Sequence, residues 1–72
     1  MFDKICKAIL EVTGKSMITM ETEFVRDLGL NSFDVIAIIG IFEDEYNIHV
    51  PTRDIWKLRT VKDLTDYLER HT

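Results

Sequence analysis

The sequence predicts an all-α fold, a small four-helix bundle of three longer helices and one short third helix, with a long loop between the first and second helices. Apolar residues recur at helical spacing in the first and last segments. Residues that can cap a helix stand before the later segments, and a glycine follows the first one. The chain has 72 residues, enough for one domain, residues 1–72, and too few for an enzyme with a cleft between two domains.

The first segment, from about Phe2 to Thr13, has the apolar stripe of an amphipathic helix. The side chains expected to form this stripe are Phe2, Ile5, Cys6, Ile9, Leu10 and Val12. Gly14 is placed to end the helix, because glycine adopts a left-handed backbone conformation at little cost.

Residues 14–30 show weak periodicity and are predicted to form a loop. Apolar side chains spread along the loop are expected to pack inward and hold it to the core: Met17, Met20, Phe24, Val25 and Leu28. A loop of this length is uncommon in so small a domain and is often functional.

The second helix is predicted to run from a cap at Asn31 to about Tyr46, with Asp34 completing an arrangement like a capping box. Its interior contains five β-branched residues and a glycine, which by propensity favour a strand. The cap before this run, and the acidic residues that continue it without a turn, favour a helix. Such a helix is apolar nearly all round, so part of its surface is expected to meet a partner or a ligand.

Two further helices are predicted after the second. The segment before Pro51 is expected to be extended, because proline disfavours helix in the preceding residue. Thr52 is predicted to cap a short helix from Arg53 to Leu58, and Thr60 to cap the last helix, with Asp63 three residues later. The buried stripe of the last helix is expected to comprise Val61, Leu64, Tyr67 and Leu68.

The composition limits the possible partners. Nine basic and 13 acidic residues give a net charge of −4, which disfavours nucleic acid and fits a basic protein partner. The sequence shows no signal-peptide pattern and no apolar run long enough for a membrane span. The single cysteine, Cys6, cannot form an internal disulfide, so we expect a reducing compartment, the cytoplasm. The chain is expected to be a monomer.

Residues that commonly carry catalysis are sparse. His71 lies near the end of the chain and His49 lies between two apolar residues, so neither is placed to activate Ser32 or Cys6 as a nucleophile. Cys6 is expected to be a core residue. No cluster of cysteine and histidine offers metal ligands, so no metal site is predicted. These observations argue against an enzyme.

The run Asp27-Leu28-Gly29-Leu30-Asn31-Ser32-Phe33-Asp34 is the feature that remains. It places Ser32 at the first position of a helix, directly after a loop that exposes it. The free N–H groups and the positive dipole end of that helix favour a nearby phosphate. From these residues alone, Ser32 either carries a phosphodiester or simply helps to start the helix.

This run, followed by an apolar helix that ends in acids, resembles the acyl carrier proteins and their peptidyl and aminoacyl carrier relatives. The resemblance covers essentially the whole chain, including the Val50-Pro51 dipeptide and the final helix that opens at Thr60-Val61. It implies a four-helix fold of acyl-carrier type and a carrier rather than an enzyme. In that family a phosphopantetheinyl transferase attaches 4′-phosphopantetheine from coenzyme A to the serine, here Ser32. The thiol of this arm then holds acyl or aminoacyl groups for enzymes of fatty-acid, polyketide or related biosynthesis.

The resemblance also implies which residues surround the cofactor and meet partners. Asp27, Gly29 and Asn31 match positions beside the cofactor-bearing serine. Proteins of the family dock on basic patches of their enzymes through the second helix, where the matching positions are Phe33, Asp34, Ile36, Glu43, Asp44 and Glu45. Arg53 and Trp56 are candidate contacts from the third-helix region.

The sequence departs from the family pattern in several places. Asn31 stands where aspartate is most usual, and Phe33 replaces the common leucine. The region from Arg53 to Lys62 is basic where fatty-acid carriers are usually acidic, and its Trp56 is either an aromatic at the core edge or a partner contact. We therefore expect a specialised carrier with dedicated partners. The alternatives are a carrier-like helical interaction module that is never modified, and a small hydrolase using Ser32, for which a base is missing.

Overall fold

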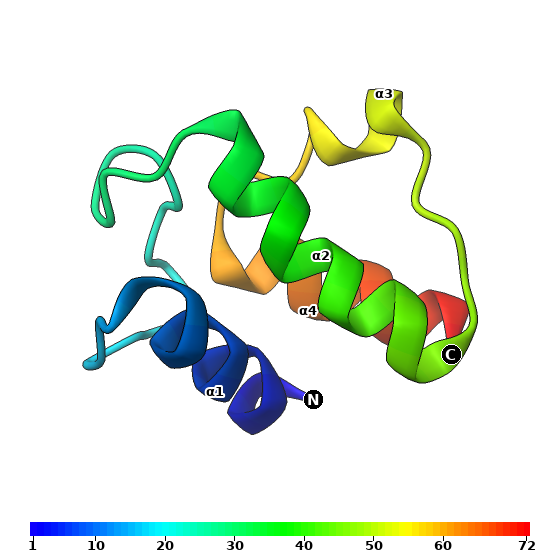
Figure 1. Cartoon of the computed structure of the whole chain (residues 1–72), viewed down its shortest axis with the longest axis horizontal. Coiled ribbons are helices and arrows are strands. Elements are labelled where there is room, and N and C mark those ends of the chain that lie inside the picture. The colour runs from blue at the N-terminus through cyan, green and yellow to red at the C-terminus, as the bar shows by residue number, and fades with distance from the viewer.

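Four helices make up the fold: α1 (Phe2–Thr13), α2 (Ser32–Tyr46), α3 (Thr52–Ile55) and α4 (Val61–His71) (Figure 1). The structure, a computed structural model, describes residues 1–72. Helix α1 packs against both α2 and α4. The predicted all-α fold, with one short third helix and a long loop after the first helix, is confirmed.

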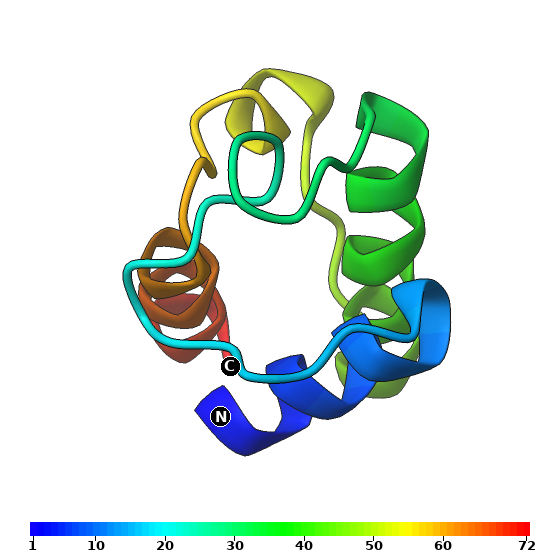
Figure 2. The same ribbon diagram turned by 90° about the vertical axis from the view of Figure 1, so that its left-hand side faces the viewer.

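The core lies between the three long helices, and the loop of residues 14–30 crosses one end of it before the chain enters α2 (Figure 2). The largest fully buried side chains come from each long helix and from the loop: Ile5, Ile9, Phe24, Ile38, Ile39, Phe42, Val61, Leu64 and Leu68. Phe24 is the contribution of the loop, so the burial of its ring holds the loop against the helices. The stripe predicted for the last helix is buried throughout.

At α1, α2 and α4, a cap stands where the sequence predicts it. Gly14 follows α1 with a φ of 74°, in the left-handed region. At the start of α2, the Asn31 side chain accepts a hydrogen bond from the Asp34 N–H, and the Asp34 carboxylate accepts one from the Asn31 N–H. Thr60 and Asp63 form the same capping box at α4. Helix α2 therefore forms despite its β-branched interior, because its cap and its packing against the core outweigh an intrinsic preference of a few tenths of a kcal/mol per residue.

The prediction for the loop is only partly right. Phe24 and Leu28 are buried and Met20 is half-buried, but Met17 is 94% exposed and Val25 is 64% exposed. The chain makes a turn of helical character from residue 23 to residue 29. Residues four apart lie on one side of such a turn, so it directs Phe24 and Leu28 inward and Val25 outward.

The buried stripe of α1 is narrower than predicted. Its fully buried side chains are Ile5, Ala8 and Ile9, whereas Leu10 and Val12 are exposed. Cys6 is half-buried rather than a core residue, because it lies at the edge of the stripe that faces α2 and α4. Burial, with a smaller effect of Asp3, raises the pKa of the Cys6 thiol, which keeps it in the protonated, unreactive form.

The predicted cap at Thr52 is wrong. Thr52 is already the first residue of α3, and no side chain caps this end of the helix. The carbonyl of Pro51 accepts hydrogen bonds from the N–H groups of Asp54 and Ile55, at 2.9 and 3.1 Å. Proline thus starts the helix through its own backbone, with φ fixed near −59°. The helix ends at Ile55 rather than near Leu58.

An antiparallel bridge between Glu23 and Thr60 joins the loop to the start of α4. Beside it, the N–H of Phe24 donates to the carbonyl of Arg59 at 3.1 Å. This pairing fixes the loop against a segment that is distant in the sequence, and no local pattern predicted it.

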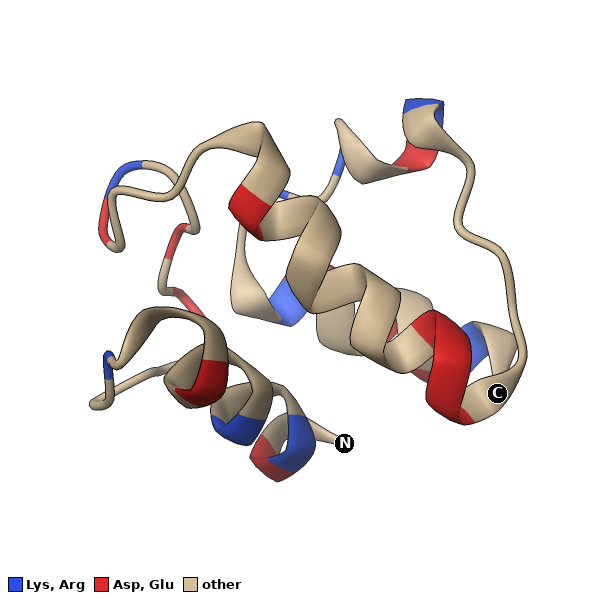
Figure 3. Cartoon of the chain, viewed as in Figure 1, with Lys and Arg blue, Asp and Glu red and all other residues tan.

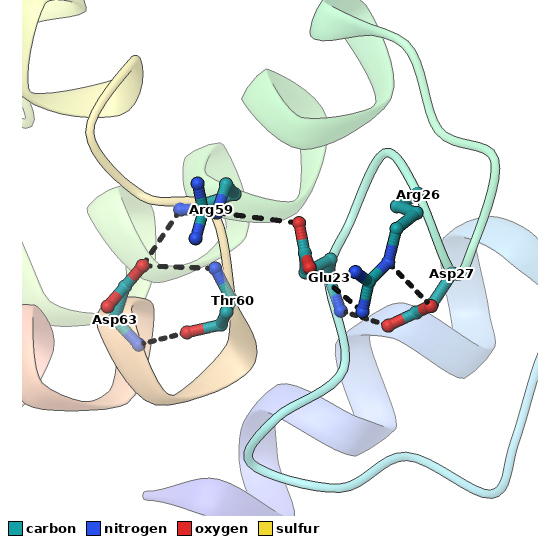
Figure 4. Close-up of polar contacts among 6 residues, drawn as sticks. All are labelled: Glu23, Arg26, Asp27, Arg59, Thr60 and Asp63. Atoms are coloured by element: carbon teal, nitrogen blue, oxygen red, sulfur yellow. Dashed lines mark hydrogen bonds and ion pairs between the residues drawn. The ribbon is translucent and has the colours of Figure 1, made fainter.

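The carboxylate of Asp63 accepts hydrogen bonds from the N–H groups of Arg59 and Thr60, each at 3.1 Å (Figure 4). Burial alone would raise the pKa of Asp63, but these hydrogen bonds prevail and hold it below its usual value. A carboxyl group with a depressed folded pKa stabilises the fold above its unfolded pKa, near pH 4, and loses this effect as the pH falls through the folded value.

We therefore expect the urea midpoint of unfolding to fall as the pH drops from about 5 to below 4. In Asp63→Asn the fall should be smaller, because the amide can still accept hydrogen bonds but does not titrate. The measurement is a series of urea denaturations followed by circular dichroism at each pH. An identical pH dependence in the two proteins would contradict a stabilising role for the Asp63 carboxylate.

Candidate functional site

Ser32 is the first residue of α2 and is exposed. The backbone of the preceding Asn31 is extended, with φ −95° and ψ 178°, so the helical conformation begins at Ser32 itself. The side-chain hydrogen bonds of the capping box join Asn31 and Asp34, and none of them occupies the Ser32 hydroxyl. The hydroxyl is therefore free to be modified, while its neighbours keep the helix start in place.

Residues 23–30 form the turn that precedes Ser32 and the start of α2. Gly29 has a φ of 66°, a left-handed conformation that glycine takes without strain. The N–H of Gly29 donates to the Val25 carbonyl, and the N–H of Leu30 donates to the Phe24 carbonyl, both at 3.0 Å. The bond from Gly29 to Val25 is that of an αL C-cap, and the second bond joins Phe24 and Leu30, whose side chains are both buried. The turn is thus closed by both backbone bonds and burial.

Hydrogen bonds and ion pairs of charged side chains stabilise the same turn (Figure 4). The Asp27 carboxylate accepts a hydrogen bond from the Glu23 N–H at 2.8 Å, and this bond, with help from Arg26, lowers the pKa of Asp27. The Glu23 carboxylate lies 3.0 Å from the Arg26 guanidinium and 3.4 Å from that of Arg59. Glu23 therefore links the turn before Ser32 to the connection before α4.

A small pocket opens beside Ser32, with a volume of about 130 Å³. Its walls come from the loop, α2, α3 and the α3–α4 connection, and are mostly apolar: Phe24, Val25, Ser32, Val35, Ile55, Trp56, Leu58 and Arg59. Two larger grooves, of about 390 and 220 Å³, do not include Ser32. Val25 and Arg59 were not predicted near Ser32, because only the bridge to α4 brings these segments together.

Helix α2 exposes apolar side chains, two of them within about one turn of Ser32. Phe33 is 80% exposed, and Ile36 and Ile41 are partly exposed. The expectation that α2 carries more apolar surface than the core requires is therefore confirmed. Phe33 and Ile36, both predicted as partner contacts, are accessible to a partner.

The acids of α2 differ in what they already bind. The Glu43 carboxylate accepts a hydrogen bond from the Val50 N–H at 2.8 Å, and Glu45 pairs with Lys4 at 3.1 Å. The Asp34 carboxylate belongs to the capping box. Asp44 is exposed and forms no ion pair. No basic residue lies along α2 (Figure 3), so its charged surface is acidic, and Asp44 is the acid most available to a partner.

Basic side chains gather in and after α3. Arg53 and Lys57 are exposed and form no ion pair, whereas Arg59 pairs with Glu23. Trp56 is 64% exposed and forms part of the wall of the Ser32 pocket. Trp56 thus lies at the edge of the core with most of its side chain accessible, and its role as a partner contact stays a prediction.

The other candidate reactive side chains lie elsewhere in the fold. His49 is exposed, with its Nδ1 atom 3.4 Å from the Glu43 carboxylate, and the His71 ring stacks on Tyr67 at 4.2 Å. Neither histidine lines the Ser32 pocket, nor does Cys6. His, Cys, Asp and Glu side chains form no group of three or more that could hold a metal ion.

The site consists of a free serine at a helix start, with a closed turn before it and a small apolar pocket beside it. The protein is therefore a helical domain that presents one side chain to other molecules. The family model described as "Phosphopantetheine attachment site" matches residues 3–68. The chain belongs to this family, that of the acyl carrier proteins, which are carriers rather than catalysts and whose cofactor is 4′-phosphopantetheine.

Individual relatives agree with this assignment. The chain is 35% identical over 74 residues to an acyl carrier protein of Clostridium perfringens (strain 13 / Type A), covering 100% of this chain and 97% of that protein. A candidate acyl carrier protein of Mycobacterium tuberculosis superposes with a TM-score of 0.90 at 26% identity, covering 99% of this chain and 97% of the other. An acyl carrier protein of Thermotoga maritima gives a TM-score of 0.82 at 34% identity, covering 94% and 81%. The resemblance stated from the sequence is thereby confirmed.

None of the four helices combines the length and apolar character that a membrane-spanning helix requires.

Proposed function

We propose that this protein carries acyl or aminoacyl groups as thioesters on a 4′-phosphopantetheine arm attached to Ser32. The observation that carries the proposal is the free, exposed Ser32 hydroxyl at the start of α2, in a chain that matches the phosphopantetheine attachment family. A mobile arm raises the effective concentration of its cargo at each enzyme on which the carrier docks.

Neighbouring residues suit the start of α2 to a phosphodiester. Asn31 and Asp34 bond to each other and hold the first turn in place, and Asp27 and Gly29 keep the preceding turn closed. The first N–H groups of a helix have no partner within it, and together with the helix dipole they favour an anion bound at Ser32. The chain supplies the hydroxyl and its fixed position, while the base that accepts the hydroxyl proton belongs to the transferase.

Loading with coenzyme A tests this proposal directly. The protein is incubated with coenzyme A and a broad-specificity phosphopantetheinyl transferase, and its intact mass is recorded. A single phosphopantetheine increment, located by fragmentation to the peptide that holds Ser32, supports the carrier. If several transferases leave the mass unchanged, the proposal fails, and an unmodified interaction module of carrier-like fold becomes the better interpretation.

Partner enzymes are proposed to dock on the face of α2 that follows Ser32. Phe33 and Ile36 supply exposed apolar contacts, and the acidic C-terminal part of α2, residues 43–45, supplies charge for a basic patch. Arg53 and Trp56 would extend this surface onto α3. Rim charges of this kind act mainly on the rate of encounter and on partner choice.

Asp44→Lys is expected to slow loading by a basic transferase about 1.4- to fivefold at low salt, which corresponds to the roughly 0.2–1 kcal/mol of an exposed charge pair. Added salt should narrow the gap. Asp44 is a better site for this test than Glu43 or Glu45, which already bond within the fold. The measurement is the initial rate of the mass increment.

Glu21→Lys is the matched control, because Glu21 is exposed and forms no ion pair. Its replacement by lysine changes the net charge by the same amount as Asp44→Lys. Its loading rate should stay close to that of the wild type. If both variants slow equally, the effect is one of net charge, and docking through the acidic end of α2 is not supported.

The pathway follows from the family only in outline, as fatty-acid, polyketide or related biosynthesis. The basic α3 region, with exposed Arg53, Lys57 and Trp56, supports a specialised carrier with dedicated partners. A monomer in the cytoplasm fits the proposed role, since a reducing compartment keeps the thiol of the arm free for thioester formation.

A further inference from the structure

We propose that the pocket beside Ser32 binds the first segment of the prosthetic arm, with the gem-dimethyl group of its pantoyl unit between Val25 and Trp56 and its phosphodiester beside Arg59. This inference rests on the proposed attachment of the arm to Ser32. It concerns the arm itself, and not the cargo at its far end.

Continuity with the attachment point is the first argument. Ser32 is itself part of the pocket wall, so an arm bonded to the Ser32 oxygen begins at the pocket. In phosphopantetheine only the phosphate and one methylene separate that oxygen from the carbon that bears two methyl groups. This branched group therefore cannot move far from the pocket, whatever the position of the terminal thiol.

Size and polarity are the second argument. The pocket volume of about 130 Å³ is close to the roughly 150 Å³ of an engineered apolar cavity that holds one benzene molecule. Such a space takes a branched group of a few carbons but not a long acyl chain. Its walls at Val25, Ile55 and Trp56 are apolar, and covering them removes both their surface and that of the two methyl groups from water.

Charge is the third argument. A phosphodiester carries one negative charge, and a guanidinium group binds phosphate oxygens through several donors at once. Arg59 lines the pocket, and its side chain is 77% exposed. Its contact with the Glu23 carboxylate is through Nε, at 3.4 Å, and no hydrogen bond occupies its terminal N–H groups, which can bind a phosphate. The hydrogen bond from Phe24 to the Arg59 carbonyl fixes this position of the backbone.

The single tryptophan makes the proposal measurable, because Trp56 is part of the pocket wall and the only source of tryptophan fluorescence. Apo and fully loaded protein are compared by acrylamide quenching, after intact mass has shown complete loading. If the docked arm covers about half of the exposed ring, a large aromatic surface, the quenching constant should fall about twofold on loading. The emission maximum should also shift to shorter wavelength.

Three variants separate the contributions to docking. In Arg59→Gln and in Val25→Ser, the difference in quenching between apo and loaded protein should shrink, since the first removes the phosphate contact and the second an apolar wall. Arg70→Gln is the matched control, because Arg70 is an exposed arginine of α4 that does not line this pocket, and its difference should equal that of the wild type.

The outcomes distinguish this inference from the carrier proposal. A chain that takes up no phosphopantetheine overturns both. A loaded chain with unchanged quenching overturns the docked arm alone and leaves the carrier intact. A difference that persists in full in Val25→Ser and in Arg59→Gln would also overturn it, since neither wall of the pocket would then contribute.

Discussion

Ser32→Ala is expected to abolish the phosphopantetheine mass increment completely, because it removes the only hydroxyl group at the start of α2. Alanine keeps the helix, since the capping box is formed by Asn31 and Asp34 and not by Ser32. The loss of loading should therefore occur in a folded protein, with the circular dichroism spectrum and urea midpoint of the wild type.

The chain provides its own control for this experiment. Ser16 is the only other serine, and it lies exposed in the loop after α1, away from any helix start. Ser16→Ala should load at the wild-type rate. An increment that survives in Ser32→Ala, or that disappears in Ser16→Ala, would place the attachment elsewhere and remove the basis of the proposed function.

Phe42→Ala is expected to destabilise the fold by about 3–5 kcal/mol, the cost of replacing a buried phenylalanine by alanine. Phe42 is 1% exposed, and its ring stacks on that of Tyr46 at a centroid distance of 6.4 Å. A domain of this length has a total stability of about 4–11 kcal/mol at the usual 0.05–0.15 kcal/mol per residue. The variant should therefore lose a large part of this stability and unfold at a much lower urea concentration than the wild type.

Phe33→Ala is the matched control in the same helix, because it makes the same change on the exposed side. Its free energy of unfolding should stay within about 0.5 kcal/mol of the wild type. Both are measured by urea denaturation followed by circular dichroism. Equal losses in the two variants, or a loss in Phe42→Ala below about 1 kcal/mol, would contradict the orientation of α2 in the structure.

Much of the fold could be predicted because its determinants are local. Asn31 and Asp34 are three residues apart, as are Thr60 and Asp63, and each pair forms the capping box that its spacing predicts. Gly14 ends α1 as expected. The same kind of prediction was wrong at Thr52. Threonine is a good capping residue, but in α3 the Pro51 carbonyl accepts the first hydrogen bonds and Thr52 is already part of the helix.

The side chains of the loop were harder to predict, because a weakly periodic segment does not show which way each residue points. Val25 was expected to pack inward and is exposed, and this places it on the rim of the pocket beside Ser32. The acids of α2 were likewise treated as equivalent. Only the folded structure shows that Glu43 holds the segment after the helix and that Glu45 pairs with Lys4.

The sequence by itself determined the three long helices, the caps of α1, α2 and α4 and the exposure of Ser32, because each depends on residues within one helical turn of one another. Only the tertiary structure decided which charges remain free and what surrounds the serine. The pair of Lys4 and Glu45 joins residues 41 positions apart, and the pocket joins the loop to the connection that holds Arg59. Such contacts arise from the packing of distant segments around a common core, and no spacing along the chain encodes them.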